Sequence, residues 1–184
     1  MKLHLGCWHR YIPGFINVDL CDMKHIDYQS RIDNLPMFED NSASLIYSSH
    51  SFEYFDKDEA NIALKEWYRI LKPNGVLRLA VPDFNSLLKV YSDTGEVDHI
   101  LGPLYGRMKI QTKSGDQVIY HRTVYNYKSL SEILIRNNFY KVRRYKWQDT
   151  MHNGYDDHSQ AYFPHMDKED GLLISLNVEA VKNV

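Results

Sequence analysis

A strand, helix and strand pattern in the middle of the chain constrains the fold most. A buried apolar run, Leu45–Tyr47, is followed by Asp56 and Glu59 at the spacing of a capping box, which predicts the start of a helix. Lys72–Gly75 ends the helical pattern, with its glycine free to take positive φ, and "VLRLAVPD" then predicts a strand. This order predicts a right-handed βαβ unit in a parallel sheet. The apolar stripe of the helix comprises Ala60, Ala63, Leu64, Trp67, Ile70 and Leu71.

Two further apolar runs near the N-terminus, Lys2–Leu5 and Phe15–Leu20, also predict strands. The segment Cys7–Gly14 between them is too short for an ordinary crossover helix, because a parallel crossover needs about a dozen residues. A glycine after one strand and an acid at the end of the next are typical of nucleotide-binding sheets. On these residues alone, two strands of an unrelated sheet joined by a loop remain an alternative.

Polar residues stand at the carboxyl ends of four predicted strands. They are Gly6, Asp19, the pair Ser49-His50, and Asp83. Ligands of open α/β sheets bind beyond the carboxyl ends of the strands. The sequence therefore predicts one site at this edge of the sheet.

Composition narrows the class of protein. A chain of 184 residues suits one domain, and a net charge of −2 with mixed signs gives no basic surface for nucleic acid. No apolar run resembles a signal peptide or reaches the roughly 20 residues of a membrane span. Cys7 and Cys21 form no disulfide framework or zinc motif. These features predict a soluble cytoplasmic protein without a nucleic-acid or membrane partner.

Several motifs together resemble a known family. "LHLGC", "INVDL", the Leu35-Pro36 pair, "SSHSFEYF" and "EWYRILKPNGVLRLAVPD" are similar to the successive motifs of small, type-11-like class I S-adenosylmethionine-dependent methyltransferases. The stretch Glu66–Asp83 is the most specific part of the resemblance, which covers residues 2–84 firmly. The resemblance implies a three-layer, Rossmann-like α/β/α fold with a mostly parallel sheet and a shortened first crossover.

The C-terminal half fits the same topology. Tyr127–Asn137 predicts a helix, "YKVRRYKW" a strand, and "GLLISLNVEAV" a final strand, which the resemblance implies is antiparallel. We expect a single domain over residues 1–184. Its cofactor-binding half would be residues 1–92, and residues 93–126 and 147–171 would be substrate-side loops.

The resemblance assigns the cofactor residues. Gly6 matches the glycine that approaches the methionine part of S-adenosylmethionine, and Asp19 matches the acid that accepts hydrogen bonds from both ribose hydroxyls. The family's adenine acid falls at Arg31 here, so Asp33 is a candidate substitute, with a plain loop as the alternative. The candidate cofactor-binding residues are Gly6, Cys7, Trp8, Asp19, Leu20, Asp33, Asn34, Leu35, Ser49 and His50.

His50 and Glu53 match the polar positions near the transferred methyl group and are the candidate catalytic residues. A histidine can act as general base on a hydroxyl or amine acceptor, because its ordinary pKa lies near neutrality. Methyl transfer also proceeds by alignment alone, which leaves open a purely structural role for His50.

Two departures from the family pattern favour an alternative function. Trp8 stands where the family has its second loop glycine, and the leading helix is missing. A binding or partner module without catalysis is therefore the alternative to a methyltransferase. An apolar sheet face without its usual covering helix would also favour a homo-oligomer.

The acceptor would be a small molecule or a glycan, and two loops supply candidate contacts. Histidine and aspartate are frequent in residues 151–171, but their spacing matches no metal motif, so a substrate-facing loop is favoured over a metal-dependent hydrolase. Surface charges without a role are the alternative for the earlier loop. The candidate acceptor residues are Arg107, His121, Arg122, His158, Tyr162 and His165.

Overall fold

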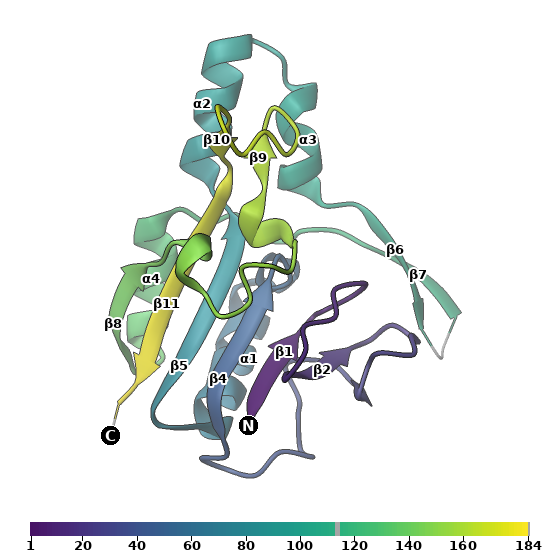
Figure 1. The fold of residues 1–184 in the computed structure, drawn as a ribbon, viewed down its shortest axis with the longest axis vertical. Coiled ribbons are helices and arrows are strands. Elements are labelled where there is room, and N and C mark those ends of the chain that lie inside the picture. Colours follow the sequence, from purple (N-terminus) through teal and green to yellow (C-terminus); the bar gives the residue numbers. More distant parts are fainter. Residues whose placement is uncertain (113–114, 184) are drawn as a thin grey trace.

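The computed structural model describes residues 1–112 and 115–183, so Lys113 and Ser114 of the predicted substrate-side loop lie outside the description. Its centre is a seven-stranded sheet with the strand order β3-β2-β1-β4-β5-β11-β8 (Figure 1). The first five strands in this order pair in parallel, and β11 pairs antiparallel with both neighbours. The predicted sheet is confirmed. Its strands are β1 (Lys2–Leu5), β2 (Ile16–Asp19), β3 (Tyr28–Gln29), β4 (Ala43–Ser49), β5 (Leu71–Pro82), β8 (Phe139–Arg144) and β11 (Ser175–Lys182).

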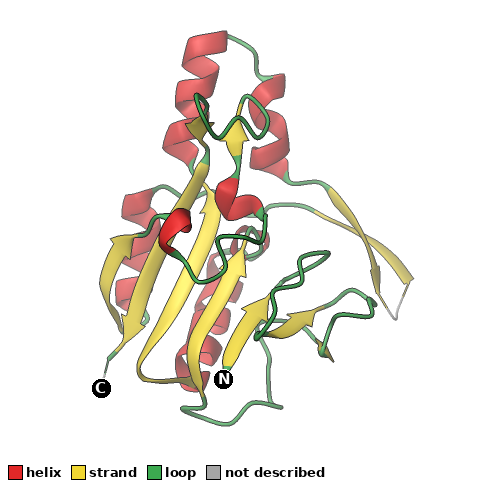
Figure 2. Ribbon diagram, viewed as in Figure 1, coloured by secondary structure: helices red, strands yellow, loops and turns green. Residues whose placement is uncertain are grey.

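Two helices, α1 (Lys57–Ile70) and α4 (Tyr127–Arg136), cover one face of the sheet (Figure 2). The predicted capping box starts α1, since the Asp56 carboxylate accepts from the backbone N–H of Glu59, and Glu59 Oε2 accepts from that of Asp56. The expected positive φ at Gly75 is wrong, because Asn74 takes it instead, at 61°. Gly75 is required for space, since a Cβ there would lie 2.8 Å from the Lys72 carbonyl oxygen.

The opposite face is covered without an α-helix. Alternation along β1 directs Leu3 and Leu5 into the α1 side and His4 to the other face, where its ring stacks on Tyr47 at 5.3 Å. Residues 145–161, including the short 3₁₀ turns η2 (Trp147–Asp149) and η3 (His158–Gln160), lie over this face. The Tyr47 hydroxyl donates to Asp157 Oδ2 at 2.5 Å. A loop thus replaces the helical layer that the short first crossover cannot supply.

Two appendages extend beyond the carboxyl ends of the strands (Figure 1). One packs α2 (Phe84–Thr94) and α3 (Asp98–Tyr105) against the small sheet of β9 (Tyr162–Phe163) and β10 (Leu172–Leu173). The other is the hairpin of β6 (Met108–Thr112) and β7 (Gly115–Ile119). Within the described residues, no helix combines the length and apolar character needed to cross a bilayer.

Trp67 ties α1 to the loop that follows β3. Its fully buried indole N–H donates to the Ile32 carbonyl at 2.6 Å. We expect Trp67→Phe to lower the free energy of unfolding by about 1–3 kcal/mol, because a buried carbonyl loses its donor. Urea denaturation measures this. Ile62→Ala on the exposed side of the same helix is the control, with an expected change within about 0.5 kcal/mol, and equal losses would contradict the prediction.

Candidate active site

A cavity of about 820 Å³ opens at the carboxyl ends of β1, β2 and β4. Its wall continues along the β6–β7 hairpin, the turn η1 (Phe52–Tyr54) and the segment 157–161. The ends of these three strands therefore converge on one site, as their polar residues predicted. Asp83, at the end of β5, does not line the cavity. Its buried carboxylate instead caps α2 and contacts Arg144. The predicted site residues in the cavity wall are Gly6, Cys7, Trp8, Asp19, Leu20, Asp33, Ser49, His50, Arg107, His121, Arg122 and His158.

Five predicted site residues lie outside the cavity wall. Leu35 is fully buried in the core, where its N–H donates to Glu66 Oε1, and the neighbouring Asn34 is absent from the wall. Tyr162 lies in β9, where its hydroxyl accepts from the Trp147 indole, and neither Tyr162 nor His165 lines the cavity. Glu53 lies behind the wall, in contact with His50.

Asp19 organises the N-terminal side of the cavity. Its Oδ2 accepts from the Trp8 N–H at 2.8 Å and its Oδ1 from the Cys21 N–H at 2.9 Å, so the carboxylate fixes the turns after both β1 and β2. Each oxygen keeps a lone pair for a further donor. Gly6 has φ 68°, and a side chain there would collide with Ser51, which explains the glycine.

Trp8 occupies a backbone conformation that favours glycine, with φ 42°. The turn is nevertheless held at both ends, because its N–H donates to Asp19 and its carbonyl contacts His25 Nε2 at 2.6 Å. The indole stacks beside His9 at 4.1 Å and forms part of the cavity wall. Trp8 therefore forms part of the cavity wall while the turn after β1 keeps its backbone hydrogen bonds.

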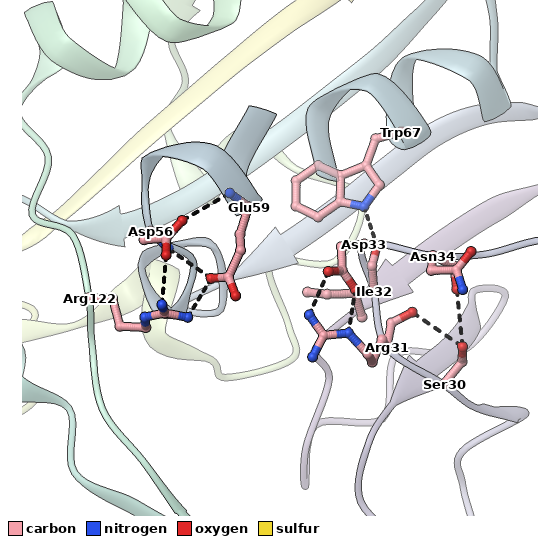
Figure 3. Close-up of polar contacts among 9 residues, drawn as sticks. All are labelled: Ser30, Arg31, Ile32, Asp33, Asn34, Asp56, Glu59, Trp67 and Arg122. Atoms are coloured by element: carbon pink, nitrogen blue, oxygen red, sulfur yellow. Dashed lines mark hydrogen bonds and ion pairs between the residues drawn. The ribbon is translucent and has the colours of Figure 1, made fainter. Parts of the chain in front are cut away.

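Arg31 and Asp33 form an ion pair at the cavity edge (Figure 3). Both Asp33 oxygens accept from the Arg31 guanidinium, at 2.9 and 2.6 Å. Arg31, which stands where the family has its adenine-binding acid, therefore neutralises the charge of Asp33, the candidate substitute for that acid. Arg122 is similarly engaged, because its guanidinium donates to Asp56 and Glu59 at the start of α1 (Figure 3). Neither guanidinium is thus a free cation.

Three histidines and one glutamate gather at the other side of the cavity. Glu53 Oε1 lies 3.7 Å from His50 Nδ1 and 3.6 Å from His121 Nε2. His50 Nε2 contacts Ser175 Oγ at 3.1 Å, and His121 Nδ1 contacts the Pro103 carbonyl at 2.9 Å. The His158 ring lies 5.1 Å from that of His50. His50 and Glu53 are close in the sequence, whereas His121 and His158 come from distant segments that the fold brings to them.

Burial makes this side of the cavity electrically neutral. It lowers the pKa of His50, His121 and His158, with neighbouring positive charge as a smaller cause at His158, so the imidazoles are uncharged near neutral pH. Burial likewise raises the pKa of the Cys7 and Cys21 thiols, which favours their protonated form near neutral pH. Among the described residues, no group of three His, Cys, Asp or Glu side chains is arranged to hold a metal ion.

Sequence reasoning missed part of the wall. The β6–β7 hairpin contributes Ile110 and Ile119. In β6 the apolar alternation covers only Met108 and Ile110, and β7 has none, so the pattern is too short to predict a hairpin. Tyr54 belongs to the motif "SSHSFEYF" but was not predicted as a site residue. Its hydroxyl donates to the Gly106 carbonyl, and its ring packs against His121 in the cavity wall. The other unpredicted wall residues include Arg10, Ile32 and Asp157.

Comparison with known proteins shows which family and fold the chain resembles. Residues 16–79, less than half of the chain, match the family model described as a methyltransferase domain. The chain has the Rossmann-like fold of class I S-adenosylmethionine-dependent methyltransferases. No curated protein matches the sequence significantly.

Solved structures of methyltransferases share the fold of this chain. A methyltransferase from Thermotoga maritima, described as a possible histamine N-methyltransferase, has a TM-score of 0.60 at 14% identity over 99% of this chain and 82% of that chain. The 1,6-didemethyltoxoflavin-N1-methyltransferase of Burkholderia thailandensis, with bound S-adenosylhomocysteine, has a TM-score of 0.55 at 12% identity over 100% and 71%. A Haloferax volcanii methyltransferase in complex with the activator Trm112 has a TM-score of 0.54 at 16% identity over 100% and 82%. At these identities the matches show the fold alone.

The chemistry of the cavity fits S-adenosylmethionine. A buried carboxylate with spare lone pairs suits a ribose diol, and Gly6 admits the close backbone approach that a side chain would block. Leu20, Ile32 and Ile110 supply apolar wall for a flat ring. The volume also lies within the range of small-ligand sites, which is about 300–1,000 Å³.

Asp19→Asn tests this fit. The asparagine amide has the size of the aspartate side chain but carries no charge. Its N–H₂ group would face one of the two backbone N–H groups that Asp19 accepts from, those of Trp8 and Cys21. We therefore expect S-adenosylhomocysteine to bind about 10- to 100-fold more weakly. Calorimetric titration measures the change. Asp22→Asn, at an exposed acid near the same turn, is the control and should leave binding unchanged. Unchanged affinity in Asp19→Asn would remove Asp19 from the ribose site.

Proposed function

We propose that this methyltransferase transfers the methyl group of S-adenosylmethionine to a small molecule with an ionisable O–H or N–H group. The observation that carries the proposal is one continuous cavity, with Gly6 and Asp19 on one side and the histidines on the other. The cofactor supplies an electrophilic methyl group on a sulfonium. The cavity of about 820 Å³ suits two small ligands side by side better than a polymer.

The cofactor half of the proposal rests on the strand ends. Asp19 would accept hydrogen bonds from the ribose, and the Gly6–Trp8 turn would lie against the methionine part. Asp33 is a weaker candidate for adenine, because the Arg31 guanidinium already contacts both of its carboxylate oxygens. The apolar wall from Ile32 and Ile110 is the better support for an adenine ring.

The acceptor half rests on His158. His50 has one ring nitrogen against Ser175 and the other facing Glu53, which suits it to positioning. His158 is more exposed, lies in the cavity wall, and has a lowered pKa, so its neutral ring can take a proton near pH 7. We therefore assign to His158 the removal of the acceptor proton, with His50 and His121 forming the wall behind it.

Paired histidine variants test this function. The protein is incubated with methyl-labelled S-adenosylmethionine and fractionated small-molecule extract, and labelled products are measured by mass spectrometry. We expect transfer by the unmodified protein and by His165→Ala, whose site lies outside the cavity, and a rate about 100-fold lower in His158→Ala. S-adenosylhomocysteine should bind all three proteins alike.

Two outcomes would contradict the proposal. Cofactor binding without labelled product in any fraction would favour the non-catalytic binding module. Equal rates in His158→Ala and His165→Ala would leave methyl transfer intact but remove His158 as the proton acceptor, since both variants lose one imidazole from the same segment.

A further inference from the structure

The carboxyl group of Glu53 is buried without a partner. Its side chain is 1% exposed, and neither carboxyl oxygen has a hydrogen-bond partner among the described residues. The backbone carbonyl of Glu53 accepts from the N–H groups of Arg122 and Thr123, which holds the residue in place. An ionised carboxylate in this position would lose its hydration without compensating donors, which is costly.

The hydrogen bond of His50 identifies which of its nitrogens carries the proton. Asn177 Nδ2 donates to the Ser159 carbonyl, so Asn177 Oδ1 accepts the single hydroxyl proton of Ser175. Ser175 Oγ must then accept from His50, which places the His50 proton on Nε2. The other nitrogen, Nδ1, carries a lone pair and faces Glu53 Oε1 at 3.7 Å.

The same reasoning applies to His121. A carbonyl oxygen can only accept, so the contact of His121 Nδ1 with the Pro103 carbonyl at 2.9 Å places the proton on Nδ1. His121 Nε2 then presents a lone pair to Glu53 Oε1 at 3.6 Å. The ring is also fixed sterically, because it lies directly against Gly106, where any side chain would collide with it. Two lone pairs thus converge on one carboxyl oxygen.

We propose that Glu53 is a positioning residue held as a neutral carboxylic acid, whose proton on Oε1 lies between His50 Nδ1 and His121 Nε2 and keeps both rings uncharged and in fixed tautomers. This inference rests on the proposed function, because it assigns these rings to the wall of the methyl-transfer cavity. The two distances exceed those of hydrogen bonds, and such contacts often shorten only when ligands bind.

The surrounding groups agree with a neutral acid. Burial raises the pKa of Glu53 to about 8 and outweighs the opposing effect of its own backbone N–H. The other ionisable groups near it are Tyr54 and Tyr125, whose pKa values are also raised mainly by burial, and His158 beyond His50. None of these groups supplies a positive charge near neutral pH that would favour the carboxylate.

An uncharged cavity wall at His50 and His121 favours binding of the cofactor. S-adenosylmethionine is a sulfonium cation, and a protonated histidine beside it would repel it. With Glu53 protonated, Oε1 lies 3.7 and 3.6 Å from the lone pairs of His50 and His121, and the wall holds no negative charge that would favour a second proton on either ring. Glu53 thus acts through the two histidines and need not touch either ligand.

Magnetic resonance of the ligand-free protein tests the proposal. With ¹³C-labelled glutamate, the carboxyl signal that disappears in Glu53→Gln should titrate with a midpoint near pH 8, and this signal should persist in Glu132→Gln, which changes an exposed acid. The ¹⁵N shifts at pH 7 should show His50 protonated on Nε2 and His121 on Nδ1. An ordinary midpoint for Glu53, or an imidazolium at either histidine, would overturn the proposal.

The pH dependence of the free energy of unfolding provides a second test of the proposal. The folded pKa of Glu53 lies above its ordinary 4.5, so its contribution to stability is complete below pH 4.5 and falls as pH rises to about 8. Glu53→Gln should lack this fall, and Glu132→Gln should retain it. An identical pH dependence in Glu53→Gln and the unmodified protein would contradict the inference.

Neither the magnetic resonance titration nor the stability measurement depends on the proposed methyl transfer. They use no cofactor or acceptor, so failure to find a methyl acceptor would leave the Glu53 result unaffected. If Glu53→Gln does not fold, the histidine ¹⁵N shifts of the unmodified protein still decide the outcome. Conversely, an ordinary Glu53 titration with normal methyl transfer would reject only the positioning role.

Discussion

Parallel pairing of β1 with β2 and β4 is the constraint on which the rest of the structure depends. It brings the carboxyl ends of these strands to one edge, so Gly6, Asp19 and His50 meet although the chain separates them. Asp19 then links the ends of β1 and β2 directly through the N–H groups of Trp8 and Cys21. The same carboxylate that orders the turns is available to a ribose, so folding and cofactor recognition share one residue.

Local signals in the sequence predicted the elements well, whereas long-range contacts decided the site. The Asp56 capping box and the first crossover without a helix follow from residues close in the chain. The positions of Tyr162 and His165 depend on how β9 and β10 pack against α2 and α3, which no local pattern encodes. The segment 93–126 was predicted to be a substrate-side loop, but the β6–β7 hairpin within it and its wall residues were not predicted, since its strands are short and mostly polar.

A loop takes the place of a helical layer on one face of the sheet. The Tyr47 and His152 rings lie in tilted contact there, with centroids 4.2 Å apart, and Asp157 accepts from the Tyr47 hydroxyl while its side chain caps η3. The capped turn carries His158 into the cavity wall. The segment that covers the sheet therefore also supplies the proposed proton acceptor, which connects the unusual fold of the N-terminal half to the chemistry of the site.

Calorimetric titration of the unmodified protein with S-adenosylmethionine and S-adenosylhomocysteine tests the central claim most directly. Asp19 and the turn held at Trp8 should support binding of both ligands with micromolar dissociation constants. Such binding would show that a tryptophan in place of the loop glycine is a tolerated variation. Absence of binding up to millimolar concentrations would contradict the assignment of this cavity to the cofactor and would direct attention to a protein partner.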